Sequence, residues 1–331
     1  MNARNSLWCL PALASCAVLL ATDAVAQTAS TGSGQAWPSR PIRMIVPFAA
    51  GGGTDIQARL FSAKLQPMLG TVIVDNRPGG GGNIGAELVA KAPPDGYTVL
   101  FQSASLAVNQ TLYRKLNYSA VRDLAPVLLV SSTPLVLVVH PSVPAKSVKE
   151  LVALAKTNQG KLNYASTSSG TTSHLAAELF KTLTGTKIAH IPYKGSGPAV
   201  TALMSGEIDL LFSPMPPTVP LVKSGRIRAL AVTTLKRSPA MPDVPTMNDT
   251  LKGFESDNWY GMFFPAGTSR DIINRFNTEM TKVLKDPDVR ANMARDGSEP
   301  LGSTPEEFGA YFKREVEKYA KVIKAAGAQV D

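Results

Sequence analysis

Cysteine is nearly absent from this sequence, which has two cysteines, Cys9 and Cys16, in 331 residues. Both lie in residues 1–26, which have the features of a cleaved secretory signal peptide: a positive charge at Arg4, an apolar stretch and a small-x-small site ending at Ala26. Cleavage there would leave a mature chain without disulfides, cysteine nucleophiles or zinc–thiolate sites. Alternatively, residues 13–16 are a lipoprotein box and Cys16 becomes a lipidated N-terminus. Both interpretations take the chain out of the cytoplasm.

Long apolar runs and clustered charges are also missing beyond residue 26. No later segment is long enough and free enough of turn residues to span a bilayer. The formal net charge of +9 comes from 34 basic and 25 acidic residues spread along the chain, without an arginine-rich run. This pattern predicts a dispersed basic surface and no nucleic-acid partner; mild steering of anionic ligands is the alternative.

Catalytic and metal-binding signatures are lacking as well. The three histidines, His140, His174 and His190, have no metal-ligand spacing, and the chain has no G-x-S-x-G sequence. We interpret His174 as a helix-surface residue. We predict no metal, no cofactor and no enzymatic activity.

What the chain does contain is a regular alternation of short apolar strands and amphipathic helices. After a polar segment at residues 27–36, predicted to be a disordered spacer, strands "IRMIVPF", "TVIVDN" and "TVLFQS" alternate with helices. The alternation restarts beyond two apolar runs near residues 130–140. Such a pattern indicates βαβ units around a mainly parallel sheet, in other words an α/β fold.

The two α/β sets predict two lobes. The C-terminal helices have no sheet of their own, so we expect them to return to the first set. Lobe 1 would then comprise residues 37–138 and 260–331, and lobe 2 residues 139–259. Two crossing segments would join the lobes around a cleft, where ligands prefer to bind and around which hinge closure is possible.

The segment "FAAGGGTD", residues 48–55, follows the first strand and begins a helix. Glycines at such a turn let an anion approach free backbone amides closely, and the helix N-terminus favours negative charge. We expect Thr54 or Asp55 to cap the helix, with ligand contact by Asp55 as the alternative. The ligand-binding candidates here are Phe48, Ala50, Gly51, Gly52, Gly53, Thr54 and Asp55.

A second segment, "SSGTTSH", repeats this arrangement in the second set with added hydroxyl groups. Its candidates are Ser168, Ser169, Gly170, Thr171 and Thr172, more hydroxyl groups than helix capping requires. Three further candidates lie at or after the ends of other strands: Ser103, Tyr193 and Ser213. Tyr193 is alternatively a buried packing residue.

A further glycine cluster, "RPGGGGNIG", has Gly80, Gly82 and Gly85 at the spacing of a dinucleotide-binding fingerprint. It follows the second strand rather than the first, and no acidic residue lies near the expected position. We interpret it as a flexible turn of the first lobe.

These motifs together resemble a known family. "WPSRPIRMIVPFAAGGGTD", "VDNRPGGGGNIGAELVAKAPPDGYTVLF", "SSGTTSHLAAELFK" and "IPYKGSGPAVTALMSGEIDLLF" are similar to segments of the Bug-type receptors, the periplasmic solute-binding proteins of tripartite tricarboxylate transporters. The resemblance extends over the whole mature chain. It implies a type II periplasmic binding fold and a periplasmic, monomeric protein that closes on one small carboxylate.

The resemblance also implies how the carboxylate is held. Backbone amides of residues 48–55 would bind it, partly through water, and residues 168–172 would complete the enclosure. Where family members commonly have a proline, this chain has Ala49 and Ala50, which leaves the glycines and Asp55 in place. Neither segment contains an arginine, so the sequence identifies no definite clamp for a second carboxylate; Arg77 and Lys194 are candidates.

Three functions compete at this point. The first is a non-catalytic receptor that delivers a di- or tricarboxylate, an acidic amino acid or an aromatic acid to the membrane subunits of a transporter. The second is a ligand sensor of the same fold that signals to a membrane kinase. The third is an enzyme on the same scaffold, which the missing nucleophile–base motif and cofactor fingerprints disfavour.

Overall fold

The computed structural model describes residues 37–326 and residue 330. The predicted signal peptide and spacer, residues 1–36, lie outside the described residues. Within the described ranges, no helix is both long and apolar enough to cross a membrane.

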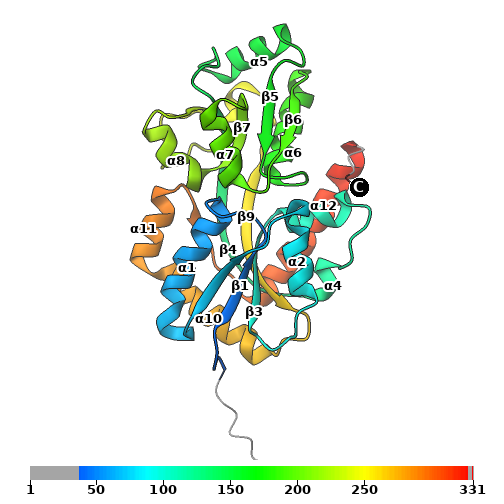
Figure 1. Cartoon of the computed structure of the whole chain (residues 1–331), viewed down its shortest axis with the longest axis vertical. Helices are drawn as coiled ribbons and strands as arrows, with labels where there is room; N and C mark the ends of the chain where they lie inside the picture. Colours follow the sequence, from blue (N-terminus) through cyan, green and yellow to red (C-terminus); the bar gives the residue numbers. More distant parts are fainter. Residues whose placement is uncertain (1–36, 327–329, 331) are drawn as a thin grey trace, which may run out of the picture. The chain divides into compact units, whose positions relative to one another are not determined.

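The first sheet starts with three parallel strands and is completed by antiparallel strands from later in the chain (Figure 1). Its order is β2-β1-β3-β9-β4, with the short β10 also paired to β4. β1 is parallel to β2 and β3, whereas β9 is antiparallel to β3 and β4. The bounds are β1 Ile42–Val46, β2 Val72–Asn76, β3 Thr98–Ser103, β4 Leu124–Val139, β9 Asp257–Pro265 and β10 Glu299–Pro300.

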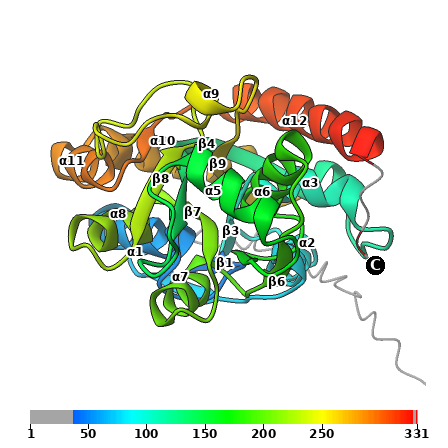
Figure 2. The same cartoon turned by 90° about the horizontal axis from the view of Figure 1, so that it is seen from above.

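Helices cover both faces of this sheet, which explains why its central strands are apolar on both sides. One face packs on α1 (Gly53–Leu69), α10 (Arg270–Lys285) and α11 (Pro287–Arg295), with Phe61 and Phe276 in the shared core. The other face packs on α2 (Asn83–Ala90), α3 (Ser105–Leu112), α4 (Ala120–Asp123) and α12 (Pro305–Ala326), with Phe263 and Phe308 in its core. Figure 2 shows α12 lying alongside α3.

The second sheet shares β4 with the first. Its order is β4-β7-β5-β6, and β8 also pairs with β4. β5, β6 and β7 are parallel, whereas β7 and β8 are antiparallel to β4. The bounds are β5 Asn163–Ser166, β6 Ala189–Pro192, β7 Leu210–Pro214 and β8 Arg228–Val232.

Helices also cover both faces of the second sheet. α5 (Val148–Thr157), α6 (Thr172–Thr184) and α9 (Met247–Thr250) enclose a core that contains Tyr164 and Phe180. α7 (Ser196–Ser205) and α8 (Met215–Lys223) enclose a core that contains Leu203 and Leu211 on the other face. We call the first sheet with its helices lobe 1 and the second sheet with its helices lobe 2.

Two chain segments connect the lobes. β4 pairs with β9 up to Pro134 and with β7 from Leu135, so one strand passes from the first sheet into the second. The return passes Ser256, whose amide donates to Thr233 O at 3.1 Å, into β9. β4 is continuous across the predicted lobe limit at 138/139, and the numerical lobe limits given above stay a prediction.

The element pattern departs from the sequence-based expectation in a few places. The apolar runs near 130–140 form the single strand β4, whose register shifts near Pro126 and Leu129 let it continue past residues typical of turns. α3, α4 and α9 were not anticipated, because they are short or lack a long apolar stripe. Asp286 and Pro287 divide the helical segment after β9 into α10 and α11.

Candidate functional site

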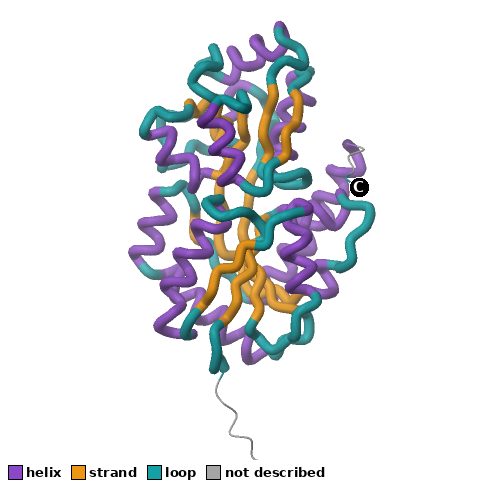
Figure 3. Tube along the Cα trace, viewed as in Figure 1, coloured by secondary structure: helices purple, strands orange, loops and turns teal. Residues whose placement is uncertain are grey.

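A small cavity lies between the lobes, where strands of both sheets end. Its volume is about 20 Å³, room for about one water molecule. Figure 3 shows the loops gathered between the two sets of strands. Lobe 1 contributes Phe48, Ser103, Asn258 and Tyr260, and lobe 2 contributes Thr167, Thr171, Thr172, Ser196 and Pro214.

The cavity is polar but carries no charged side chain among its described lining residues. Burial raises the pKa of the Tyr260 phenol, although hydrogen bonds with Thr54 and Asn258 lower it, so the phenol stays neutral. Two helices begin at the wall: Thr171 is the N-cap of α6, and Ser196 is the first residue of α7. Helix N-termini present unpaired N–H groups and partial positive charge, so the cavity favours an anion that needs no cationic partner.

The glycine loop, residues 48–55, contacts the other lobe through its backbone. The amide of Ala49 donates to Lys194 O at 2.8 Å, and the amide of Gly53 donates to Ser196 Oγ at 3.1 Å. A Cβ atom on Gly197 would overlap Ala50 O, so the two loops pass each other at backbone distance. The glycines therefore permit close approach of the two lobes, in addition to any ligand that they admit.

Asp55 organises the glycine loop from within. Its carboxylate accepts hydrogen bonds from the Gly51 amide at 2.9 Å, from Asn76 Nδ2 at 3.0 Å and from Arg59 Nε at 3.0 Å. Burial alone would raise the pKa of Asp55, but these hydrogen bonds hold it below its ordinary value. Gly52, not Thr54 or Asp55, is the N-cap of α1, and Asp55 bonds back to the loop like the acidic residue of a capping box. Its negative charge and engaged oxygens oppose direct contact with an anionic ligand.

The threonine loop, residues 167–172, forms the lobe 2 wall. Thr171 Oγ1 donates to Ser168 O at 2.7 Å and accepts from Thr167 Oγ1 at 2.9 Å, which rigidifies the turn. Thr172 Oγ1 donates to Asn258 Oδ1 at 3.2 Å, a contact between the lobes inside the cavity. The loop therefore both lines the cavity and contacts lobe 1.

The sequence-predicted residues divide into three groups. The cavity brings together Phe48, Ser103, Thr171 and Thr172, while Gly52, Gly53, Thr54 and Asp55 lie buried beside it. Eleven candidates thus lie outside the lining, and seven of these have other surroundings. Ala50 and Gly51 border an outer groove, Ser168, Ser169 and Gly170 face other parts of the structure, and the hydroxyls of Tyr193 and Ser213 bond Glu207 and Thr218. Ligand contact by any candidate stays a prediction.

The second glycine cluster is a tightly packed turn, not the flexible one expected from the sequence. Gly81 O accepts from Asn109 Nδ2 at 3.0 Å, and a Cβ on Gly81 would lie 2.6 Å from Ser169 O of lobe 2. Tyr113 Oη donates to the Ser169 carbonyl oxygen at 3.3 Å. This turn is therefore another place where the lobes meet.

Residues 58–328 match the family described as the tripartite tricarboxylate transporter family receptor. The chain belongs to this family. It is similar to the protein BugT of Bordetella pertussis, with 38% identity over 322 residues that cover 96% of this chain and 98% of BugT. These findings confirm the resemblance to Bug-type receptors.

Solved structures agree with this assignment. R. palustris Rpa4515, solved with adipate, is 36% identical and covers 89% of this receptor and 100% of its own chain, with a TM-score of 0.86. MatC from Rhodopseudomonas palustris, solved with bound malate, is 30% identical and covers 86% of this receptor and 99% of its own chain, with a TM-score of 0.82. The receptor therefore has the type II periplasmic binding fold, with two α/β lobes and a ligand cleft between them. It is a solute-binding protein and not an enzyme.

Sequence reasoning missed five lining residues of this receptor: Thr167, Ser196, Pro214, Asn258 and Tyr260. Thr167 and Pro214 each directly adjoin a predicted strand end, a signal that was available. Ser196 lies in "YKGSGPA", a motif already singled out, but its importance comes from lobe contacts that the sequence does not show. Asn258 and Tyr260 lie within a buried strand and read as core.

The two candidate cationic clamps also lie outside the lining. Arg77 Nε is 3.0 Å from Asp75 Oδ1, and the exposed Lys194 contributes its carbonyl oxygen to the loop contact. Among the described residues, no group of histidine, cysteine and carboxylate side chains is arranged to hold a metal ion.

Proposed function

We propose that this receptor captures a small carboxylate by hinge closure over the interlobe cavity and delivers it to the membrane subunits of a tripartite tricarboxylate transporter. One observation carries the ligand class: the cavity is lined by hydroxyls and by the N-termini of α6 and α7, without a charged side chain among its lining residues. Adipate in Rpa4515 and malate in MatC support the same class. The first ligands to test are therefore C4–C6 dicarboxylates.

The cavity volume constrains how the ligand is held. About 20 Å³ is too small for a dicarboxylate, since it holds about one water molecule. Loading therefore requires the lobes to part, with motion concentrated in β4 near Pro134 and in the return segment near Ser256. One carboxylate would occupy the polar centre, and the rest of the ligand would extend toward the groove bordered by Ala50 and Gly51.

The test is a thermal-shift screen of residues 27–331 with malate, adipate and adipamide, the last having the length of adipate without its charge. A ligand at a hundred times its Kd stabilises the folded protein by about 2.7 kcal/mol, enough to shift the Tm visibly. We expect a shift with at least one dicarboxylate and none with adipamide. Equal shifts with adipate and adipamide would exclude carboxylate recognition, and no shift with either acid would exclude C4–C6 dicarboxylates as the ligand.

Delivery needs a separate experiment. Membrane vesicles that contain the transporter subunits should take up the identified acid only when the loaded receptor is added. If uptake did not depend on the receptor and a sensor kinase responded to the loaded receptor, the proposed transport function would be wrong and a signalling function would take its place.

A further inference from the structure

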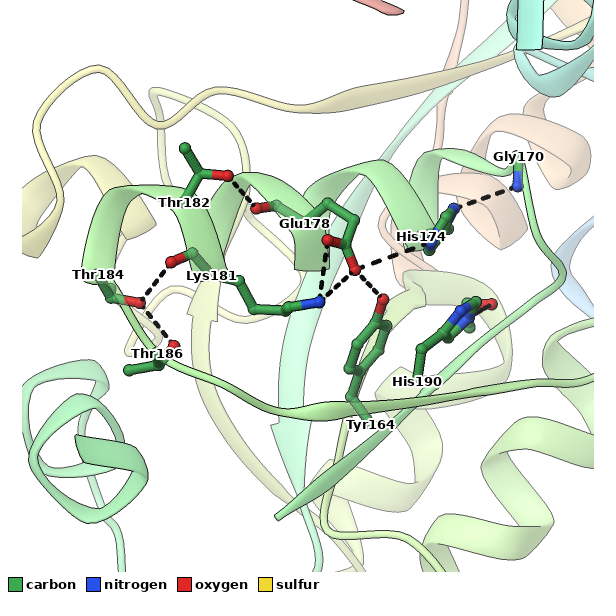
Figure 4. A network of polar contacts seen from close by, with 10 residues as sticks. Tyr164, Gly170, His174, Glu178, Lys181, Thr182, Thr184, Thr186 and His190 are labelled. Carbon is green, nitrogen blue, oxygen red and sulfur yellow. Dashed lines mark hydrogen bonds and ion pairs between the residues drawn. The ribbon is translucent and has the colours of Figure 1, made fainter. Parts of the chain in front are cut away.

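Behind the threonine loop lies a stack of three aromatic rings that the sequence did not suggest. His190 stacks between Tyr164 and His174, with ring centroids 4.8 Å and 4.3 Å apart and interplanar angles of 13° and 14°. The His174 side chain is 17% exposed, so its interpretation as a helix-surface residue was wrong. Figure 4 shows the three residues with Glu178 and Lys181 beside them.

Both histidines contact the ends of the loop that lines the cavity. The amide of Gly170 donates to His174 Nδ1 at 3.3 Å, and Ser166 Oγ lies 2.7 Å from His190 Nε2. Of the lining residues, Thr167 lies between these two anchor points and Thr171 directly follows Gly170, so the histidines act on the wall of the cavity without touching its contents.

The Gly170 bond fixes the protonation state of His174. A backbone amide can only donate, so Nδ1 must carry a lone pair and the ring must be neutral with its proton on Nε2. A proton on Nδ1 removes the acceptor and places a second N–H against the Gly170 amide. The loop geometry described above is therefore compatible only with an uncharged His174.

The same loop position contributes to the contact between lobes. A Cβ on Gly170 would lie 2.5 Å from Asn109 Oδ1 on α3, and the adjacent Ser169 O accepts from Tyr113 Oη. Releasing Gly170 from His174 would thus disturb the cavity wall and lobe closure together.

The surrounding charges leave the stack neutral. Glu178 is paired with Lys181 at 2.7 Å and accepts from Tyr164 Oη, while its Oε1 is 3.8 Å from His174 Nε2. Burial lowers the pKa of His174, outweighing the attraction of Glu178, and burial together with His174 lowers the pKa of His190 to about 4. Around neutral pH both rings are therefore uncharged.

We propose that His174 is a positioning residue for ligand binding, and that it holds the threonine loop in place only while the His174–His190 stack is uncharged. This inference rests on the proposed function, because it assigns the loop to a carboxylate site. Its consequence is a receptor that binds at neutral pH and releases its ligand in acid.

Two variants separate the acceptor from the charge. His174→Asn places Oδ1 near the position of Nδ1 and cannot be protonated in this range, whereas His174→Phe keeps a stacking ring without an acceptor. His140→Asn is the matched control, since His140 bonds Ser142 at the start of lobe 2, away from the loop. Adipate affinity is measured for all four proteins from about pH 7.5 down to about pH 4, because burial lowers the pKa of both stacked histidines below the ordinary value.

Wild type and His140→Asn should lose affinity about tenfold more than His174→Asn across this range, because adipate itself titrates equally in every sample. His174→Phe should bind weakly at every pH. Parallel decline of wild type and His174→Asn, or full affinity in His174→Phe, would overturn the inference.

A ligand-free measurement keeps this test independent of the choice of acid. The Gly170 amide ¹H–¹⁵N signal should titrate together with the His174 ring in wild type and stay constant in His174→Asn. A Gly170 signal that ignores His174 protonation would refute the positioning role. Failure of adipate to bind at neutral pH, with the Gly170 titration present, would count against the proposed ligand alone.

Discussion

The amide of Gly53 in lobe 1 donates a hydrogen bond to the hydroxyl of Ser196 in lobe 2, at 3.1 Å and beside the interlobe cavity. The first turn of α1 and the first residue of α7 are thereby joined across the cleft. This bond exists only when the lobes are together, so it contributes to the closed state and not to the fold of either lobe.

Ser196→Ala should therefore weaken ligand binding with little change in the stability of the ligand-free protein. A hydrogen bond contributes about 0.5–1.5 kcal/mol, so we expect the Kd for the identified acid to rise about 2- to 12-fold. Calorimetric titration measures this change. Ser224→Ala, which alters an exposed hydroxyl at the end of α8, is the control. Unchanged affinity in Ser196→Ala would show that the bond is dispensable for closure.

Gly52→Val tests close approach of the lobes. Gly52 has φ −86° and ψ 170°, which valine adopts readily, but its Cβ would lie 2.8 Å from Ser196 Oγ. We expect ligand binding to fall more than about tenfold, while the ligand-free protein loses about 1 kcal/mol of stability at the N-cap. Gly309→Ala, which meets only ordinary contacts in α12, should bind normally. Wild-type affinity in Gly52→Val would contradict our account of the loop.

Asp55→Asn should reduce stability rather than remove a ligand contact. Losing charge-assisted hydrogen bonds to Gly51 and Arg59 costs about 2 kcal/mol, measured as the free energy of unfolding at neutral pH. Because the folded-state pKa of Asp55 is lowered, its stabilisation is present above about pH 4 and is lost as the pH falls through the folded value. The difference between wild type and variant should therefore shrink in acid. A large affinity loss with unchanged unfolding would instead assign Asp55 to the ligand.

Stability should also depend on His190. Its pKa falls from about 6.5 in an unfolded chain to about 4 in the fold, so its neutral form is favoured by folding. This contribution is complete above about pH 6.5 and is lost as the pH falls to about 4. The free energy of unfolding, measured by denaturation at several pH values in this range, should fall less with decreasing pH in His190→Asn than in wild type. The same pH dependence of stability in both proteins would show that His190 has the same pKa in the folded and unfolded states.

The sequence predicted the elements better than the directions of their side chains. Strand and helix periodicity identified β3 at its observed bounds and placed Thr171 and Thr172 at a helix start on the cleft. The same hydroxyl-rich segment did not reveal that Ser169 and Gly170 face lobe 1 instead of the cavity. That orientation depends on His174 and Asn109, whose roles come from tertiary contacts.

Residues whose roles depend on distant partners were the hardest to recognise. Ser196 and Gly53 are separated by 143 positions, and no local pattern connects them. Asp55 shows that a local interaction can be misjudged as well: we expected Thr54 or Asp55 to be the cap, whereas Gly52 is the N-cap of α1 and Asp55 accepts from the Gly51 amide.

The shared strand β4 also affects how the protein is made. β3 pairs with β9, so the first sheet stays incomplete until residues 257–265 have been synthesised, after every strand of the second sheet. Lobe 2 can therefore complete its hydrogen bonding first. Until β9 is made, the edge of β3 in the first sheet stays unpaired. Pairings so distant along the chain slow folding and prolong the exposure of that edge to aggregation. During synthesis, lobe 2 can thus complete its sheet before lobe 1, although lobe 1 contains the first strands to be made.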